Sequence, residues 1–162
     1  MAIGVYPGTF DPLTIAHLAV ADAAVEHLGL ERLDLAISEA ALGKEHLDET
    51  SITRRVDGIV TAAGARPWLG VVVVRARLVV DVAEGYDAVV MGADKWAQVN
   101  DPVWYGDDPG SRDAALRRLP RVAVAPRAGH DVPPELLLPV PSGFEHVSAS
   151  AVRSGRDEWA AR

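Results

Sequence analysis

The sequence predicts an α/β domain in which a mostly parallel, five-stranded sheet carries helices on both faces. Two observations predict it: five apolar runs of strand length alternate with stretches of helical character, and the longest apolar run, Trp68–Val74, is continuous. Continuous apolar runs are typical of parallel strands that are buried on both faces, and strands that alternate with helices are typical of a parallel sheet. The chain has 162 residues and no shift in composition between its halves, so one domain over residues 1–162 is expected.

Each element has a local signal. The expected strands are apolar runs bounded by turn-forming or charged residues: Ala2–Tyr6, Leu33–Ser38, Trp68–Val74, Asp87–Met91 and Arg121–Ala125. The expected helices have apolar residues near helical spacing, capping residues or a terminal glycine: Ile15–Leu28, Ile52–Ala63, Leu78–Glu84, Asp94–Val99, Arg112–Arg118 and Ala149–Ala160. Thr14 is expected to cap the first helix, and Thr50 or Ser51 the second. The segment 128–142, which contains four prolines, is expected to be an irregular connection.

Composition excludes several classes of protein. Hydrophobic residues make up 49% of the chain and charged residues 24%, a balance that is typical of globular proteins and too apolar for disorder. No apolar run reaches the roughly 18–20 residues of a membrane helix, and the opening MAIGVYPG lacks the features of a secretory signal. The absence of cysteine excludes disulfides, thiolate catalysis and cysteine-ligated zinc. We therefore expect a cytoplasmic protein that contacts no membrane.

The net charge of −7 predicts a surface that repels nucleic acid and anionic membranes. An anionic ligand would therefore have to meet a local cluster of positive groups. In a parallel sheet, ligands bind beyond the carboxyl ends of the strands, where the strand order reverses. We accordingly expect the chemistry in the loops that follow Tyr6, Ser38, Met91 and Ala125.

The first candidate segment joins the first strand to the first helix. Gly8 and Thr9 let the backbone approach a ligand closely, and the helix start offers unpaired N–H groups. The hydroxyl of Thr14 and the imidazole of His17 lie on one helical face, so both would meet a phosphate placed there. An ordinary strand–turn–helix with a capping threonine and a half-buried histidine has the same pattern, and this alternative stays open.

Two further segments follow the fourth strand and open the last helix. Gly92 permits close approach of a ligand, and Asp94 would accept from ribose hydroxyls or cap the short helix. Ser148 and Ser150 stand at the start of the last helix with Arg153 one turn inside it, which suits an anion or a simple helix cap. Taken together, the three segments could border one triphosphate.

The segment YPGTFDPLTIAH resembles the (H/T)xGH signature of the nucleotidyltransferase superfamily, and VSASAVR resembles its second motif, ISSTxxR. With MGADKW, the resemblance covers nearly the whole chain and implies a Rossmann-like fold. The opening is also similar to that of pantetheine-phosphate adenylyltransferases, while MGADKW and the HxSxSxxR pattern at His146–Arg153 are similar to nicotinate or nicotinamide mononucleotide adenylyltransferases. Ala16 and Ala149 depart from the two motifs by an added methyl and a lost hydroxyl, so weakened ATP binding is expected.

The resemblance implies transfer of AMP from ATP to a phosphorylated small molecule, nicotinate or nicotinamide mononucleotide, with release of pyrophosphate in NAD biosynthesis. Its implied catalytic residues are His17, Thr14 and Arg153. The residues implied for ATP binding belong to the three segments: Gly8, Thr9, Phe10, His17, Gly92, Asp94, Ser148, Ser150 and Arg153. Mg²⁺ would be held through the ATP phosphates, with no dedicated metal site and with Asp11 as the only carboxylate nearby.

Four residues are candidates for binding the acceptor by the same resemblance: Lys44, Arg55, Trp96 and Trp104. The two cations would bind its phosphate, and the tryptophans would stack on a pyridine ring. A solvated lysine, a helix-surface arginine and core tryptophans are the competing interpretations. Three alternative functions also stay open: a pantetheine-phosphate adenylyltransferase, an enzyme that uses CTP instead of ATP, and a nucleotide-binding protein without catalysis. The chain could also form a homo-oligomer.

Overall fold

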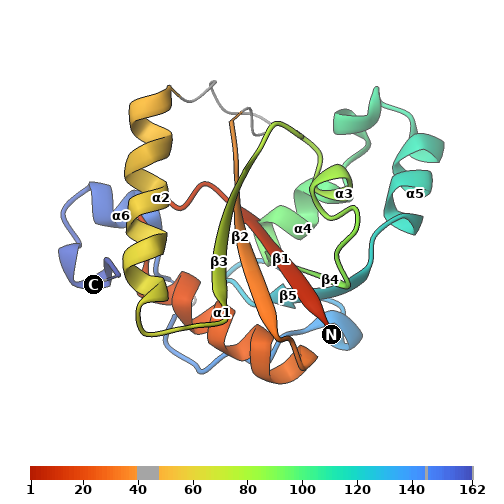
Figure 1. Cartoon of the computed structure of the whole chain (residues 1–162). Coiled ribbons are helices and arrows are strands. Elements are labelled where there is room, and N and C mark those ends of the chain that lie inside the picture. The colour runs from red at the N-terminus through yellow and green to blue at the C-terminus, as the bar shows by residue number, and fades with distance from the viewer. Residues whose placement is uncertain (40–47, 145, 162) are drawn as a thin grey trace.

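The computed structural model describes residues 1–39, 48–144 and 146–161 (Figure 1). Within these residues, five strands form one sheet in the order β3-β2-β1-β4-β5, and every neighbouring pair is parallel. The strands are β1 (Ile3–Gly8), β2 (Arg32–Ser38), β3 (Leu69–Val74), β4 (Ala88–Gly92) and β5 (Arg121–Ala125). The chain moves outward from β1 to β3 and then crosses to β4 on the other side of β1. The expected parallel α/β fold is confirmed, and the strand order reverses between β1 and β4.

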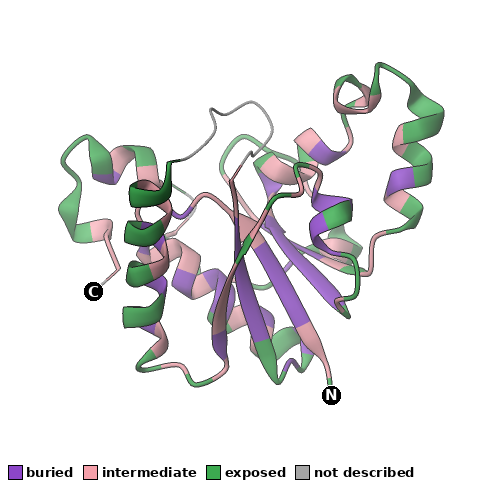
Figure 2. Ribbon diagram, turned by 45° about the horizontal axis from the view of Figure 1, so that its top comes forward, coloured by how far each residue is buried: buried purple, intermediate pink, exposed green. Residues whose placement is uncertain are grey.

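Helices cover both faces of this sheet. On one face, α1 (Ile15–Leu28) and α2 (Glu49–Ala63) pack against a cluster that includes Leu33, Leu35 and Val90. On the other, α3 (Val79–Val82) and α4 (Ala93–Val99) pack against a second cluster, and α5 (Pro109–Arg117) adds a partly buried leucine to it. In Figure 2 the central strands are coloured mostly as buried, while the helices on either side carry most of the exposed residues.

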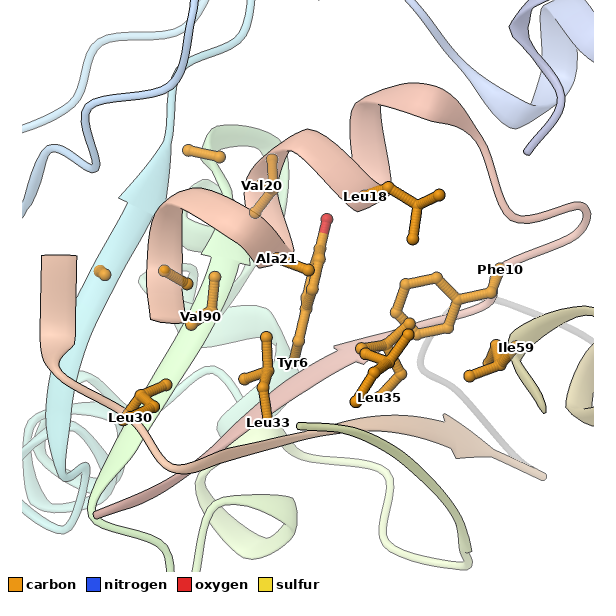
Figure 3. Close-up of a cluster of buried hydrophobic side chains, with 14 of the residues drawn as sticks. Tyr6, Phe10, Leu18, Val20, Ala21, Leu30, Leu33, Leu35, Ile59 and Val90 are labelled. Carbon is orange, nitrogen blue, oxygen red and sulfur yellow. The ribbon is translucent and has the colours of Figure 1, made fainter. Parts of the chain in front are cut away.

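The cluster beneath α1 shows how the sheet is held against its helix. In Figure 3, Val20 and Ala21 of α1 lie next to Tyr6 of β1, and Leu18 lies next to Phe10. These side chains and Leu33 of β2 are buried in one cluster. Burial of an aliphatic side chain of this size contributes about 1.5–3 kcal/mol. The core therefore fixes α1, and with it the position of the first helical turn at the carboxyl end of β1.

Helix α1 begins where the sequence predicts, and for the predicted reason. The Thr14 hydroxyl accepts a hydrogen bond from the backbone N–H of His17 at 3.2 Å, while the imidazole of His17 accepts one from the backbone N–H of Thr14 at 2.9 Å. This reciprocal arrangement satisfies two backbone donors of the helix start. The helix ends at Gly29, whose φ of 64° suits a residue without a Cβ.

Three other helix boundaries differ from the prediction by three residues or more. Helix α5 begins at Pro109 rather than Arg112, because the carboxylate of Asp108 accepts a capping hydrogen bond from the backbone N–H of Gly110. Helix α2 begins at Glu49 rather than Ile52, because the carboxylate of Asp48, not Thr50 or Ser51, accepts the capping hydrogen bond. The last helix, α6 (Ala149–Arg153), stops seven residues before the expected Ala160. Gly155, with φ of 116°, turns the chain there, and a short 3₁₀ turn follows at Asp157–Trp159.

The strand β3 also differs from expectation. It pairs with β2 alone and forms one edge of the sheet, and 42% of Val73 is exposed, so this strand is not covered on both faces. The proline-rich connection is irregular, as its composition predicts, apart from a 3₁₀ turn at Pro134–Leu136 and an isolated bridge from Leu137 to Val124 of β5. Among the described residues, no helix is long and apolar enough to cross a membrane.

Candidate functional site

A cavity of about 300 Å³ lies beyond the carboxyl ends of the strands, at the reversal between β1 and β4. Its volume is that of a small-molecule site. The lining includes every residue that the resemblance implies for catalysis or ATP binding: Gly8, Thr9, Phe10, Thr14, His17, Gly92, Asp94, Ser148, Ser150 and Arg153. Three segments that lie far apart in the sequence therefore border a single cavity.

The imidazole of His17 is held in one tautomer by its partner at the helix start. The backbone N–H of Thr14 can only donate, so Nδ1 of His17, at 2.9 Å, must carry the lone pair. The proton of the neutral ring then sits on Nε2, which makes this nitrogen a hydrogen-bond donor. The arrangement suits a histidine that donates to an anionic oxygen rather than one that accepts a proton from a substrate.

Electrostatics keep this imidazole neutral. The pKa of His17 is lowered from 6.5 to about 4: burial is the largest cause, the positive charge of Arg127 adds to the lowering, and the charge of Asp94 opposes it. A desolvated imidazole with a positive neighbour resists protonation because its charged form loses hydration and meets a like charge. At neutral pH the cavity therefore contains an uncharged Nε2–H donor.

An aromatic cluster fixes the direction of the ring. The Phe10 ring meets the His17 ring edge to face with centroids 4.9 Å apart, and it meets Tyr6 in the same way at 5.3 Å. Phe10 is fully buried although its φ of 46° lies in the left-handed region, a backbone conformation that costs about 1–3 kcal/mol. Burial of the Phe10 ring offsets this strain, and the contact of that ring with His17 restricts the orientation of the imidazole.

The turn that opens α6 reaches back to the first loop. Ser148 caps α6, since its hydroxyl accepts from the backbone N–H of Ala151 at 3.1 Å. The guanidinium of Arg153 donates to the hydroxyl of Ser150 at 3.0 Å and to the main-chain carbonyl of Asp11. These contacts hold the two motifs against each other on the side of α2, where α6 lies in Figure 1.

Arg55 occupies a different place from the one implied for it. Its side chain is only 8% exposed and does not line the cavity, because the guanidinium donates to the Thr9 carbonyl at 3.1 Å and pairs with the Asp11 carboxylate at 3.0 Å. Arg54 pairs with the second oxygen of the same carboxylate at 3.2 Å. Arg55 thus clamps the loop from α2 instead of facing an acceptor. Asp11, the carboxylate considered for a metal, is engaged by Arg54 and Arg55 and also lies 4.0 Å from Arg153.

This clamp predicts that Arg55 contributes more to stability than the neighbouring Arg54. Arg55→Met should lower the free energy of unfolding by about 1–3 kcal/mol, because it leaves the Thr9 carbonyl and the Asp11 carboxylate without their buried donor. Arg54→Met is the matched control: Arg54 pairs with the same Asp11 but is exposed, so its loss should cost no more than about 1 kcal/mol. Urea unfolding measures both, and equal losses from the two variants would contradict the clamp.

The other residues implied for the acceptor do not meet at the cavity. Lys44 lies outside the described residues. Trp96, in α4, is partly buried against the core on the α3–α4 face, and Trp104 lies in the 3₁₀ turn Pro102–Tyr105; neither lines the cavity. Asp94 is an exposed residue in the first turn of α4, and the cap position belongs to Gly92 instead.

The cavity also contains cations that sequence reasoning missed. Arg77, Lys95 and Arg127 line it together with Arg153, while Asp94 is the only carboxylate among the described lining residues. Arg77 lies three residues beyond β3, and Arg127 two beyond β5. A count of basic residues just after each predicted strand would have found both. The cavity is thus locally positive in a chain whose net charge is −7.

Comparisons with known proteins agree with this geometry. The family model described as Cytidylyltransferase-like matches residues 5–153. Among solved structures, the chain is similar to nicotinic acid mononucleotide adenylyltransferase from Plasmodium falciparum, which was solved in complex with NaAD. The TM-score is 0.61 at 13% identity, and the match covers 94% of this chain and 82% of that one. No curated protein matches by sequence.

Proposed function

The chain belongs to the cytidylyltransferase-like family, and on that premise we propose that it transfers AMP from ATP to nicotinate or nicotinamide mononucleotide and releases pyrophosphate. Family and fold mark an enzyme of the nucleotidyltransferase superfamily. One observation carries the proposal for the triphosphate: the starts of α1 and α6, with His17 and Arg153, line the same cavity. The resemblance of MGADKW, and the fold shared with a mononucleotide adenylyltransferase, support the acceptor.

In this reaction an oxygen of the acceptor phosphate attacks the α-phosphorus of ATP. The bond from that phosphorus to the bridging oxygen breaks, and pyrophosphate leaves with the electron pair. Such transfers depend mainly on positioning and on stabilisation of negative charge. The Nε2–H of His17 and the free N–H groups of the first turn of α1 would donate to the phosphate oxygens, where charge grows in the transition state.

The leaving pyrophosphate would lie between the two motifs. Ser148, Ser150 and Arg153 stand on one side of the cavity, and Arg127, close enough to His17 to lower its pKa, adds a second positive charge. Arg153 is about half exposed; it donates to a hydroxyl and a carbonyl and lies 4.0 Å from the Asp11 carboxylate, which Arg54 and Arg55 already engage. A phosphate would be a stronger acceptor than the hydroxyl or the carbonyl. We therefore assign Arg127 to charge stabilisation alongside Arg153.

The donors fit magnesium that is carried by the nucleotide. Within the described ranges no three acidic or histidine residues form a metal cluster, and Asp94 is the carboxylate that the cavity offers. Mg²⁺ takes few protein ligands and keeps phosphate and water oxygens. Held by the ATP phosphates and Asp94, it would neutralise phosphate charge.

Pyrophosphate release tests the proposal. The protein should release pyrophosphate with ATP, Mg²⁺ and at least one of the two mononucleotides, and release little with CTP in place of ATP. Phosphopantetheine serves as the competing acceptor. If only phosphopantetheine supported pyrophosphate release, phosphopantetheine and not a mononucleotide would be the acceptor. If calorimetry showed ATP binding but no acceptor supported release, the catalytic role would be contradicted.

A further inference from the structure

We propose that Arg77 binds a second negative group of the acceptor, so that the preferred acceptor is a phosphomonoester that carries another anion at its far end. This inference rests on the proposed function and narrows its substrate. Of the two mononucleotides, nicotinate mononucleotide has such a group, a ring carboxylate, while nicotinamide mononucleotide has a neutral amide in its place.

The pairing of arginines across the molecule singles out Arg77. Nine described arginines lie within 4.0 Å of a carboxylate: Arg32, Arg54, Arg55, Arg66, Arg75, Arg112, Arg118, Arg153 and Arg156. Four have no carboxylate within that distance among the described residues: Arg77, Arg117, Arg121 and Arg127. Arg77 and Arg127 line the cavity, and the other two do not. Among the described arginines that line the cavity, these two are the ones without a carboxylate within 4.0 Å.

The fold separates the two cavity arginines. The hydroxyl of Ser38, the last residue of β2, donates to the carbonyl of Ala76 at 2.7 Å, which ties the loop before Arg77 to the end of β2. Arg127 follows β5, and both β1 and β4 lie between β2 and β5 in the sheet. Arg77 therefore enters the cavity from the side opposite Arg127.

The two arginines also differ in their relation to the reacting centre. The charge of Arg127 acts on the imidazole of His17, whereas Arg77 is not among the groups that shift its pKa. The attacking phosphate must lie near His17 and the α-phosphorus, so it is the part of the acceptor closest to Arg127. Arg77 is placed for a different anion, at the end of the acceptor that points away from the reaction.

The surroundings of Arg77 suit a flat ring that ends in an anion. Val79 and Val82 of α3, which follow shortly after Arg77 in the chain, and Ala36 of β2 also line the cavity; the three belong to one apolar cluster and offer an apolar surface. A guanidinium can bind a carboxylate through two parallel hydrogen bonds, and it gives a neutral amide no comparable partner. The expected selectivity is therefore for the charged acceptor over its amide.

Arg77→Gln tests this inference with the two mononucleotides as probes. In the wild-type protein, KM for nicotinate mononucleotide should be lower than KM for nicotinamide mononucleotide. Arg77→Gln should raise KM for nicotinate mononucleotide by about 10- to 100-fold, the range for loss of a charge-assisted hydrogen bond. KM for nicotinamide mononucleotide and the kcat values with both acceptors should stay within a few-fold of the wild-type values. Arg75→Gln, in the same loop and outside the cavity lining, should retain the wild-type ratio.

Calorimetric binding of each mononucleotide separates failure of the inference from failure of the proposed reaction. If ATP gives no pyrophosphate with any acceptor, the proposed function fails, yet Arg77→Gln must still weaken binding of the carboxylate compound and not of the amide. The inference would be overturned if Arg77→Gln left the ratio of the affinities for the two mononucleotides unchanged, or if Arg75→Gln lost as much affinity for nicotinate mononucleotide as Arg77→Gln. It would also be overturned if neither mononucleotide bound the wild-type protein.

Discussion

Replacement of His17 by alanine is expected to lower kcat by about 10²–10³-fold, the loss that follows removal of one preorganised donor at a developing negative charge. The neutral Nε2–H is held in position by the bond at Nδ1 and by the Phe10 ring, so it needs no reorganisation in the transition state. Initial rates of pyrophosphate release at saturating ATP and acceptor measure the effect.

The alanine variant also removes half of the capping arrangement at Thr14, so a second variant must separate catalysis from folding. In His17→Gln the glutamine can still accept from the Thr14 N–H, which preserves the cap. Its thermal stability should match that of the wild-type protein while kcat remains strongly reduced. His27→Ala, in the last turn of the same helix and exposed, is the control that should change neither property. A wild-type kcat in His17→Gln would contradict the assigned donor.

Arg127→Gln should lower kcat by about 10²-fold, because it removes a positive charge beside the transferred phosphate. The same substitution should raise the pKa of His17 from about 4 toward 6.5, since burial remains but the positive neighbour is gone. Protonation of the ring competes with the bond that Nδ1 accepts, so the acid limb of the kcat profile should move to higher pH. An NMR titration of the His17 ring measures the pKa directly.

The sign of the linked stability effect follows from the same pKa. In the folded protein His17 binds a proton only near pH 4, whereas in the unfolded chain it does so near 6.5. Unfolding therefore takes up a proton between these values, and stability falls as the pH drops through this window. Arg127→Gln should make that loss smaller, and Arg121→Gln, at the opposite end of the same strand, should leave it unchanged. Identical titrations in the wild-type protein and Arg127→Gln would refute the electrostatic contact.

Local sequence patterns were enough to predict the strands and α1. Their signals, such as a β-branched run, the cap at Thr14 or the glycine at Gly29, act within one element. The end of α6 was missed because helical spacing continues past Gly155, and the chain turns there through a glycine conformation that the pattern does not reveal. The edge position of β3 depends on strand order, which a single apolar run cannot specify.

The same difference between local and long-range information explains the site residues. Thr14 and His17 were found because one helical turn connects them. Arg55 was assigned to the acceptor because a basic residue on a helix looks the same whether it faces a ligand or a carboxylate. Its partner Asp11 is 44 residues away in the sequence, and only the folded chain brings the two together. The positions of Arg77 and Arg127 just after two strands are visible in the sequence. That neither has a carboxylate partner among the described residues can be seen only in three dimensions.

The contact between Arg153 and the Asp11 carbonyl joins positions 142 residues apart, and the backbone N–H of Ala161 likewise donates to the carbonyl of Leu13. Closing so long a loop has an entropic cost that must be met before the contact gives any stabilisation. On a ribosome, the loop that follows β1 emerges early, but the cavity stays incomplete until Ser148, Ser150 and Arg153 have also been synthesised. A nascent chain could thus form its whole sheet and still be unable to bind a nucleotide.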